Sequence, residues 1–214
     1  MDIEAYVHEI MPYNPQNKDS ISYELWYATA FLLPEDKIPK IDSLNIIEAR
    51  LERRVRPVID SIIHSIGKDL SLQILNNEEN DISPLVKEYL KKGDINAYCK
   101  VNIYSYSISL YMAEVYSFIP AYGDTFYNLL KLAFQSQKNQ IQNITFNEDI
   151  IRFLSCQEQD LAIYCLIKSY KKGDIKEAKT LAYYFKEGIY FKKDINIANT
   201  LDSIHENRPL VIFK

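Results

Sequence analysis

The stretch that decides the fold is Ser169-Tyr170-Lys171-Lys172-Gly173-Asp174-Ile175, because it recurs almost unchanged elsewhere in the chain. The earlier copy is Tyr89-Leu90-Lys91-Lys92-Gly93-Asp94-Ile95, and a third, shorter copy is Phe191-Lys192-Lys193-Asp194-Ile195. Each copy joins two segments whose apolar residues recur at helical spacing. A glycine can end the first helix and the aspartate can cap the second. The recurring stretch therefore predicts the turns of αα-hairpins.

Working outward from these turns, the apolar spacing predicts helices along most of the chain. The longest begins at Asp42 or Ser43 and runs to about Ile66, and Pro57 inside it should kink or split it. Residues 101–112 fit a strand by propensity and a helix by spacing, and we favour the helix. The other predicted helices span 2–10, 20–33, a segment starting at Pro84, 124–137, 147–156, 158–172, 174–187 and 194–205.

The composition agrees with a helical chain that has a substantial core. Apolar residues make up 47% of the 214 residues, which is ample for burial. Only five residues are glycine, which argues against folds built on glycine-rich phosphate loops or turn-dense β-sandwiches. We therefore predict an all-α protein with an N-terminal helical bundle, residues 1–80, continuous with an αα-repeat region, residues 81–205. An apolar C-terminal tail, residues 206–214, is expected to dock on it.

The repeat region resembles tetratricopeptide-type repeats, and especially the Sel1-like subclass. The resemblance covers about residues 85–204 and is best at 158–204. It is carried by small, large, aromatic and glycine residues in two successive runs: Ala162, Leu166, Tyr170 and Gly173, then Leu181, Ala182, Phe185, Gly188, Asp194 and Ala198. The resemblance implies a short αα-solenoid that binds proteins and has no catalysis of its own. The small and large residues should be buried between helices: Ala162, Leu166, Leu181 and Ala182.

The termini and cysteines predict a cytoplasmic protein. The N-terminus carries acids where a signal peptide has bases, and no run of 18 apolar residues could span a membrane. Three cysteines, Cys99, Cys156 and Cys165, form no disulfide pattern. We interpret Cys156 and Cys165 as packing residues.

No residue pattern indicates a metal site, a cofactor or a nucleophile. The three histidines lie far apart, and phosphate-loop and dinucleotide motifs are absent. Glu48 and Glu52 lie beside Arg50, Arg53, Arg54 and Arg56, which leaves a hydrolase as an alternative. Charges at three- and four-residue spacing are, however, typical of pairs along an exposed helix.

Charge and aromatic content favour a binding protein instead. Residues 1–80 hold 14 acids and 8 bases, whereas residues 81–214 hold 15 acids and 17 bases. Eight lysines gather within residues 168–193, and tyrosines lie among them. Tyrosine offers rigid apolar area with a polar tip, which suits interfaces. The predicted partner-binding residues are Tyr183, Tyr184, Tyr190, Lys179, Lys186, Lys192 and Lys193.

These observations together predict a non-catalytic protein that binds a protein partner, with neither nucleic acid nor membrane as its target. The most specific hypothesis is a bacterial immunity-type protein that neutralises a toxin or effector by occlusion. A Sel1-like adaptor in signalling or assembly is the second hypothesis. The hydrolase with the Arg/Glu-rich helix is the third.

Overall fold

The structure, a computed structural model, describes residues 32–68, 88, 90–100, 105–138 and 145–206. The described part of the chain is helical, apart from turns and one isolated bridge between Leu32 and Asp174. The α-helices are α3 (Asp42–Lys68), α5 (Ile95–Lys100), α6 (Tyr106–Tyr116), α7 (Pro120–Lys138), α8 (Cys156–Lys171), α9 (Glu177–Glu187) and α10 (Ile195–Glu206), and the short 3₁₀ helices are η1 (Glu35–Lys37) and η3 (Glu148–Phe153).

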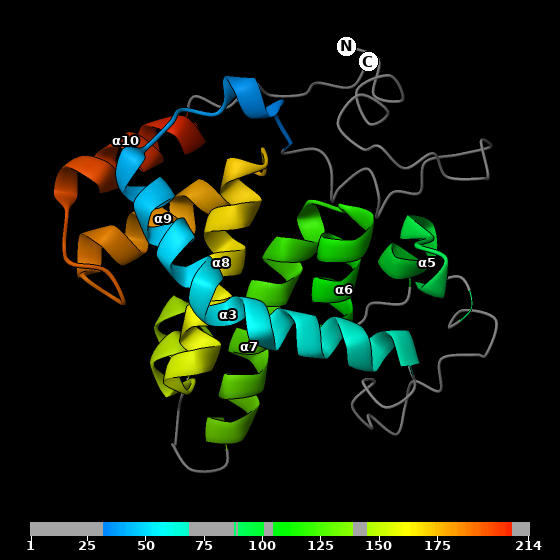
Figure 1. Ribbon diagram of the computed structural model, residues 1–214. Coiled ribbons are helices and arrows are strands. Elements are labelled where there is room, and N and C mark those ends of the chain that lie inside the picture. The colour runs from blue at the N-terminus through cyan, green and yellow to red at the C-terminus, as the bar shows by residue number, and fades with distance from the viewer. Residues whose placement is uncertain (1–31, 69–87, 89, 101–104, 139–144, 207–214) are drawn as a thin grey trace.

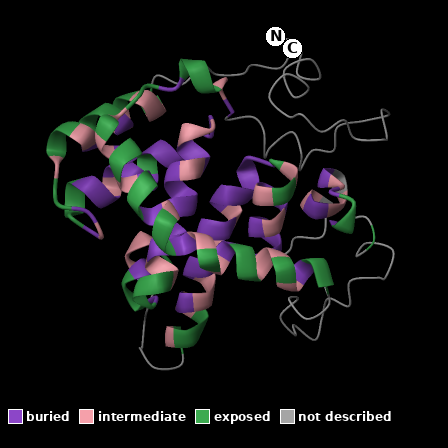
Figure 2. Cartoon of the chain, in the orientation of Figure 1, coloured by how far each residue is buried: buried purple, intermediate pink, exposed green. Residues whose placement is uncertain are grey.

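Successive helices pack on one another from α6 to α10, and α3 lies across α6 and α8 (Figure 1). In that view α9 and α10 lie at one end of the molecule and α5 at the other. Buried residues gather where α6, α7 and α8 meet, and the outer sides of α3 and α10 are exposed (Figure 2). One hydrophobic cluster extends from Ile38 through α3 to Leu201, so α3 and the later helices share a core.

The repeat-derived predictions of local structure are confirmed at the turns. Gly93 and Gly173 both lie between helical segments and have positive φ. Asp94 and Asp194 cap the helices that follow, because their Oδ1 atoms accept hydrogen bonds from the backbone N–H groups of Ala97 and Ile197. The side chain of Asp174 is buried instead, beside Lys176. The capping prediction is therefore wrong for Asp174.

Four packing predictions are confirmed, since Ala162, Leu166, Leu181 and Ala182 are all buried. They lie on α8 and α9, where small residues let neighbouring helices approach closely. The preference for helix over strand is confirmed for residues 106–112, which belong to α6. Residues 101–104 lie outside the described part.

The predicted kink of the long helix is confirmed, since α3 continues through Pro57 and changes direction midway (Figure 1). Two other helix predictions need correction. Residues 148–153 form the 3₁₀ helix η3 rather than an α-helix. Leu32 and Leu33 are not helical: the Leu33 N–H donates to the Gly173 carbonyl, 2.9 Å away. The predicted helices over 2–10, over the rest of 20–33 and at Pro84, and the apolar tail, lie outside the described residues.

Candidate functional site

The eight lysines within residues 168–193 divide into two groups. Four form ion pairs with acids of the fold, and the partners are Glu48, Glu35 and Asp174. Within the described part of the chain, the other four are not in ion-pair distance of any carboxylate: Lys179, Lys186, Lys192 and Lys193. The unpaired group is the set of lysines that the sequence predicted as partner-binding.

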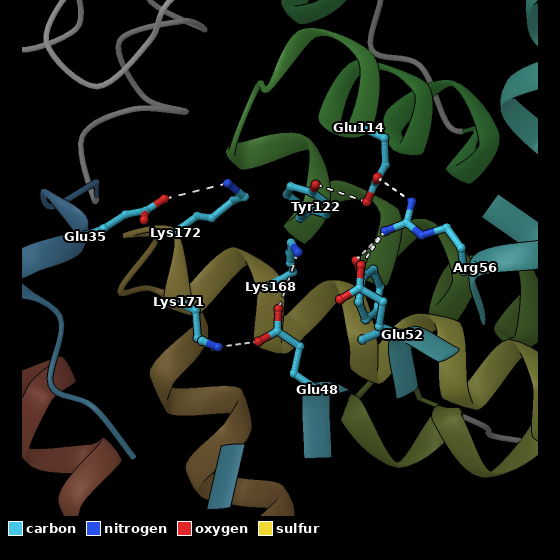
Figure 3. A network of polar contacts seen from close by, with 10 residues as sticks. Glu35, Glu48, Glu52, Arg56, Glu114, Tyr122, Lys168, Lys171 and Lys172 are labelled. Atoms are coloured by element: carbon cyan, nitrogen blue, oxygen red, sulfur yellow. Dashed lines mark hydrogen bonds and ion pairs between the residues drawn. The ribbon is translucent and has the colours of Figure 1, made fainter. Parts of the chain in front are cut away.

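The paired lysines hold α3 on α8. Glu48 of α3 is buried, and its carboxylate lies 3.4 Å from Lys168 Nζ and also accepts a hydrogen bond from Lys171 (Figure 3). Lys172 Nζ lies 3.6 Å from Glu35 Oε1 of η1. These ion pairs hold the C-terminal end of α8 against η1 and the beginning of α3.

Arg56 makes a second set of contacts further along α3 (Figure 3). Its guanidinium donates to Glu52 Oε1 at 2.7 Å and to Glu114 Oε2 of α6 at 2.9 Å. The Tyr122 hydroxyl donates to the same Glu114 carboxylate at 3.1 Å. The Arg56–Glu52 pair has the predicted four-residue spacing. Glu48 and Arg56 also reach other helices, so the Arg/Glu-rich helix contributes to tertiary packing as well as to an exposed face.

A groove of about 760 Å³ lies between α3 and the start of α10, over the ends of α8 and α9. We call it the α3–α10 groove. Its volume is within the range of ligand sites in proteins. The residues that line it come from α3, the first turn of α8, the end of α9 and the 189–197 segment. Two regions far apart in the sequence thus meet at one concave surface.

Cations and apolar side chains both line this groove. Arg50 and Arg54 come from α3, and Lys192 and Lys193 come from the third copy of the recurring turn. The apolar lining consists of aliphatic and aromatic side chains: Ile47, Leu51, Phe185, Phe191 and Ile197. Phe185 and Phe191 stack on each other with ring centroids 4.3 Å apart and planes 7° from parallel.

The groove's carboxylates are already engaged. Asp160 is buried at the α8 side, where Arg54 lies 2.7 Å from its Oδ2 and the Tyr190 hydroxyl donates to Oδ1. Asp194 Oδ1 accepts hydrogen bonds from the N–H groups of Asn196 and Ile197 at 3.0 and 3.1 Å. Asp194 forms no ion pair within the described residues, so the groove lining carries four positive and two negative charges and its net charge is positive.

The backbone of Tyr190 has a conformation that is unusual for a residue other than glycine. Its φ is 64°, in the left-handed region that costs non-glycine residues about 1–3 kcal/mol. The contact with Asp160 and an edge-to-face contact with Phe191 hold it there. Tyr190 is consequently a fixed part of the groove wall.

The other two predicted tyrosines do not line the groove. Tyr184 is fully buried, at 0% exposure, and its hydroxyl donates to the Glu148 carbonyl at 3.0 Å. It packs in the core and cannot serve as a surface anchor while the fold is intact. Tyr183 is half-buried, and its hydroxyl donates to Asp149 Oδ1 at 3.0 Å. Lys179 and Lys186 are exposed on α9 but also lie outside the groove.

The structure brings together Tyr190, Lys192 and Lys193 with residues that the sequence did not place at the site. Arg50 and Arg54 were recognised only as part of the Arg/Glu-rich helix. Their spacing of four residues on α3 was the one available signal, since it puts both on one helix face. Cys156 was predicted to pack, yet it is exposed and lines the groove, whereas Cys165 is buried as expected.

A second polar cluster lies in the core, at the turn between α8 and α9. Asp174 and Glu177 are both buried, and Lys176 Nζ lies 3.1 Å from Asp174 Oδ2 and 3.8 Å from Glu177 Oε1. Burial raises the pKa of Glu177 to about 8, against the opposing effect of Lys176. The pKa of Asp174 is also raised by burial. Among the described residues, neither oxygen of the Glu177 carboxyl has a hydrogen-bond partner, and a buried carboxyl without such donors favours its protonated, uncharged form.

Comparisons of the chain with protein-family models, with curated proteins and with solved structures find no match. In the described part of the chain, no three His, Cys, Asp or Glu side chains are arranged to hold a metal ion. None of the helices in that part is long and apolar enough to cross a membrane.

Proposed function

We propose that this chain is a non-catalytic binding protein that takes a segment of a partner protein into the α3–α10 groove. The more specific proposal is an immunity-type protein of the bacterial cytoplasm, which neutralises a toxin or effector by occluding it. The resemblance to Sel1-like repeats supports a protein-binding role, and the successive packing of α8, α9 and α10 agrees with that resemblance.

One observation carries the proposal: apolar side chains and four cations line a concave surface of about 760 Å³, and three of these cations form no ion pair within the described residues. Binding surfaces combine a water-excluding apolar centre with polar groups at the rim that steer the encounter. Lys192 and Lys193 have no ion-pair partner within the described residues, so their charges are available to a second molecule. This arrangement favours partner binding.

The contacts of the groove carboxylates, Asp160 and Asp194, support partner binding rather than catalysis. A general base needs a carboxylate or imidazole that is free to reach the proton it removes. Asp160 is occupied by Arg54 and Tyr190, and Asp194 is occupied by the backbone of α10. Both groove carboxylates therefore have structural partners already.

The test is capture of the partner from the native cell lysate with the immobilised full chain, followed by mass spectrometry. Lys192→Glu/Lys193→Glu reverses two groove charges, and Lys179→Glu/Lys186→Glu reverses two exposed charges outside the groove. We expect the first variant to lose the partner and the second to retain it. Circular dichroism of both variants should match that of the parent.

Two outcomes would contradict the proposal. Loss of capture in the Lys179→Glu/Lys186→Glu variant alone would place the site on the outer face of α9. Equal capture by all variants would exclude the groove. The immunity hypothesis adds a requirement: the captured protein should arrest growth when expressed alone, and co-expression of this chain should restore growth. A captured protein without toxicity would favour the adaptor hypothesis.

A further inference from the structure

We infer that the partner segment that enters the α3–α10 groove is a short acidic stretch carrying an aliphatic or aromatic side chain. This inference rests on the proposed function and names the chemistry of the segment that the same site would take. It follows from the net charge of the groove, from its apolar surfaces and from the packing of its aromatic rings.

The charge balance selects an acidic segment. Within the described residues, Arg50, Lys192 and Lys193 form no ion pair. Arg54 uses one nitrogen on Asp160, and its side chain remains 57% exposed, so its other N–H groups can still donate. Four cations and two carboxylates thus line the groove, which leaves it with a net positive charge. Charge-assisted hydrogen bonds from arginine and lysine to carboxylates are stronger than neutral ones.

The apolar surfaces select a hydrophobic residue within that segment. Ile47 and Ile197 line the groove and are partly exposed, so a partner side chain could cover them and exclude water. Two large aliphatic residues that neighbour groove-lining residues in the sequence are also exposed: Ile46, at 63%, precedes Ile47 on α3, and Ile195, at 45%, follows Asp194 at the start of α10. Covering both on binding would remove apolar surface from water, which favours association with a hydrophobic side chain.

The aromatic rings disfavour nucleic acid, the other polyanion that a basic groove could bind. Single strands bind where bases stack on exposed aromatic faces. The faces of Phe185 and Phe191 are stacked on each other, and both residues are buried. Tyr190 is held by Asp160 at its hydroxyl and by Phe191 at its ring. The groove therefore offers aliphatic contacts and cations without exposed ring faces, which suits a peptide.

The experiment is selection from a random peptide library displayed on phage, with the immobilised full chain as target and Lys192→Glu/Lys193→Glu for counter-selection. Enriched peptides are then synthesised with a fluorophore and titrated by anisotropy. We expect Asp or Glu beside Leu, Ile, Phe or Trp. The affinity should fall about tenfold or more in the Arg50→Glu and Lys192→Glu/Lys193→Glu variants and decrease as salt increases. Lys179→Glu/Lys186→Glu should bind as tightly as the parent.

The inference is overturned if no peptide is enriched, or if the enriched peptides are neutral or basic. It is also overturned if a fluorescent oligothymidine binds the parent but does not bind the Lys192→Glu/Lys193→Glu variant. These results are separable from the test of the proposed function. Native capture that depends on Lys192 and Lys193, combined with non-acidic selected peptides, would leave the groove as the site and reject only the acidic segment.

Discussion

The 169–175 turn and the 191–195 turn are copies of one sequence, but their side chains differ in burial and ion pairing. In the first, Lys171 and Lys172 pair with acids, Asp174 is buried and Ile175 is only 2% exposed. In the second, both lysines are unpaired within the described residues, Asp194 caps α10 and Ile195 is exposed. The first turn stabilises the fold, and the second borders a groove.

The difference arises from what covers each turn. The segment before α3 lies on the first turn: the Leu33 N–H donates to the Gly173 carbonyl, and the Tyr170 hydroxyl donates to the Pro39 carbonyl at 3.1 Å. In the described part of the chain, the second turn is instead open to the α3–α10 groove. The recurring motif therefore determines the local turn. The segments packed around each turn determine whether its lysines form ion pairs within the fold or can contact a partner.

The largest effect is expected from Gly173→Ala. Gly173 has φ of 116°, and an added Cβ would lie 2.0 Å from the Leu33 carbonyl oxygen. Backbone strain and displacement of Leu33 should together lower the free energy of unfolding by about 3–5 kcal/mol, measured by urea denaturation. The matched control is Gly188→Ala, where φ is 70° and the nearest atom is 3.4 Å away. It should cost about 1 kcal/mol, and an equal cost at both sites would contradict the comparison.

The two isoleucines that follow the turns provide the next test. Ile175→Ala removes a buried side chain and should lower the free energy of unfolding by about 2–4 kcal/mol. Ile195→Ala removes an exposed one and should change it by less than about 0.5 kcal/mol. Thermal and urea denaturation of both variants would measure the contrast. Similar losses would show that the second turn is covered by part of the chain or by a second copy.

The first turn should also make stability depend on pH. The Glu177 carboxyl, with a pKa of about 8 in the fold and an ordinary value of 4.5, keeps its proton over a range in which the unfolded chain has lost it. The folded state then binds more protons, so stability should fall as pH rises from about 5 to 8, by at most about 1.4 kcal/mol per pH unit. Asp174, whose pKa is also raised by burial, acts in the same direction.

The control for this pH dependence is Glu177→Gln, which keeps the shape of the side chain and removes its titration. Urea denaturation at several pH values should give a flatter profile for this variant than for the parent. Glu187→Gln, at the exposed end of α9, should retain the parent's profile. A parent whose stability is constant or increases between pH 5 and 8 would show that Glu177 is ionised in the fold.

The smallest effects are expected from substitutions of the corresponding lysines in the two turns, Lys171 and Lys192. Lys171→Met breaks the contact with buried Glu48 and should cost about 1 kcal/mol, because Lys168 still neutralises that carboxylate. Lys192→Met should change stability by less than about 0.5 kcal/mol. Partner affinity should respond in the opposite order, with loss in Lys192→Met and little change in Lys171→Met. Equal effects of both variants on affinity would move the binding surface away from the groove.

Much of the local structure could be predicted from the chain alone. Helical spacing located α3 and α6 to α10, and the Gly-Asp pairs located the turns at Gly93 and Gly173. These signals are local, because a helix repeats every 3.6 residues and a cap acts within one turn. Two of the local failures have physical causes that the structure shows. Asp174 is drawn into the core beside Lys176, and Leu33 is held in an extended form by its hydrogen bond to Gly173.

The candidate site was predictable only in part. The sequence selected Tyr190, Lys192 and Lys193, which line the groove, but also Tyr184, which is buried. A tyrosine's spacing along a helix does not reveal which face another element will cover. Arg50 joins the site only because α3 lies beside the 189–197 segment in the fold.

The sequence by itself determined an all-helical chain with repeated turns and a surplus of lysine in its second half. The tertiary structure alone decided which lysines remain free to meet a partner. Lys171 forms an ion pair with Glu48, 123 residues away in the sequence, whereas Lys192 and Lys193 line a groove and form no ion pair within the described residues. The physical reason is that ion pairing depends on distance in space and on burial, and neither is encoded in the spacing of charges along the chain.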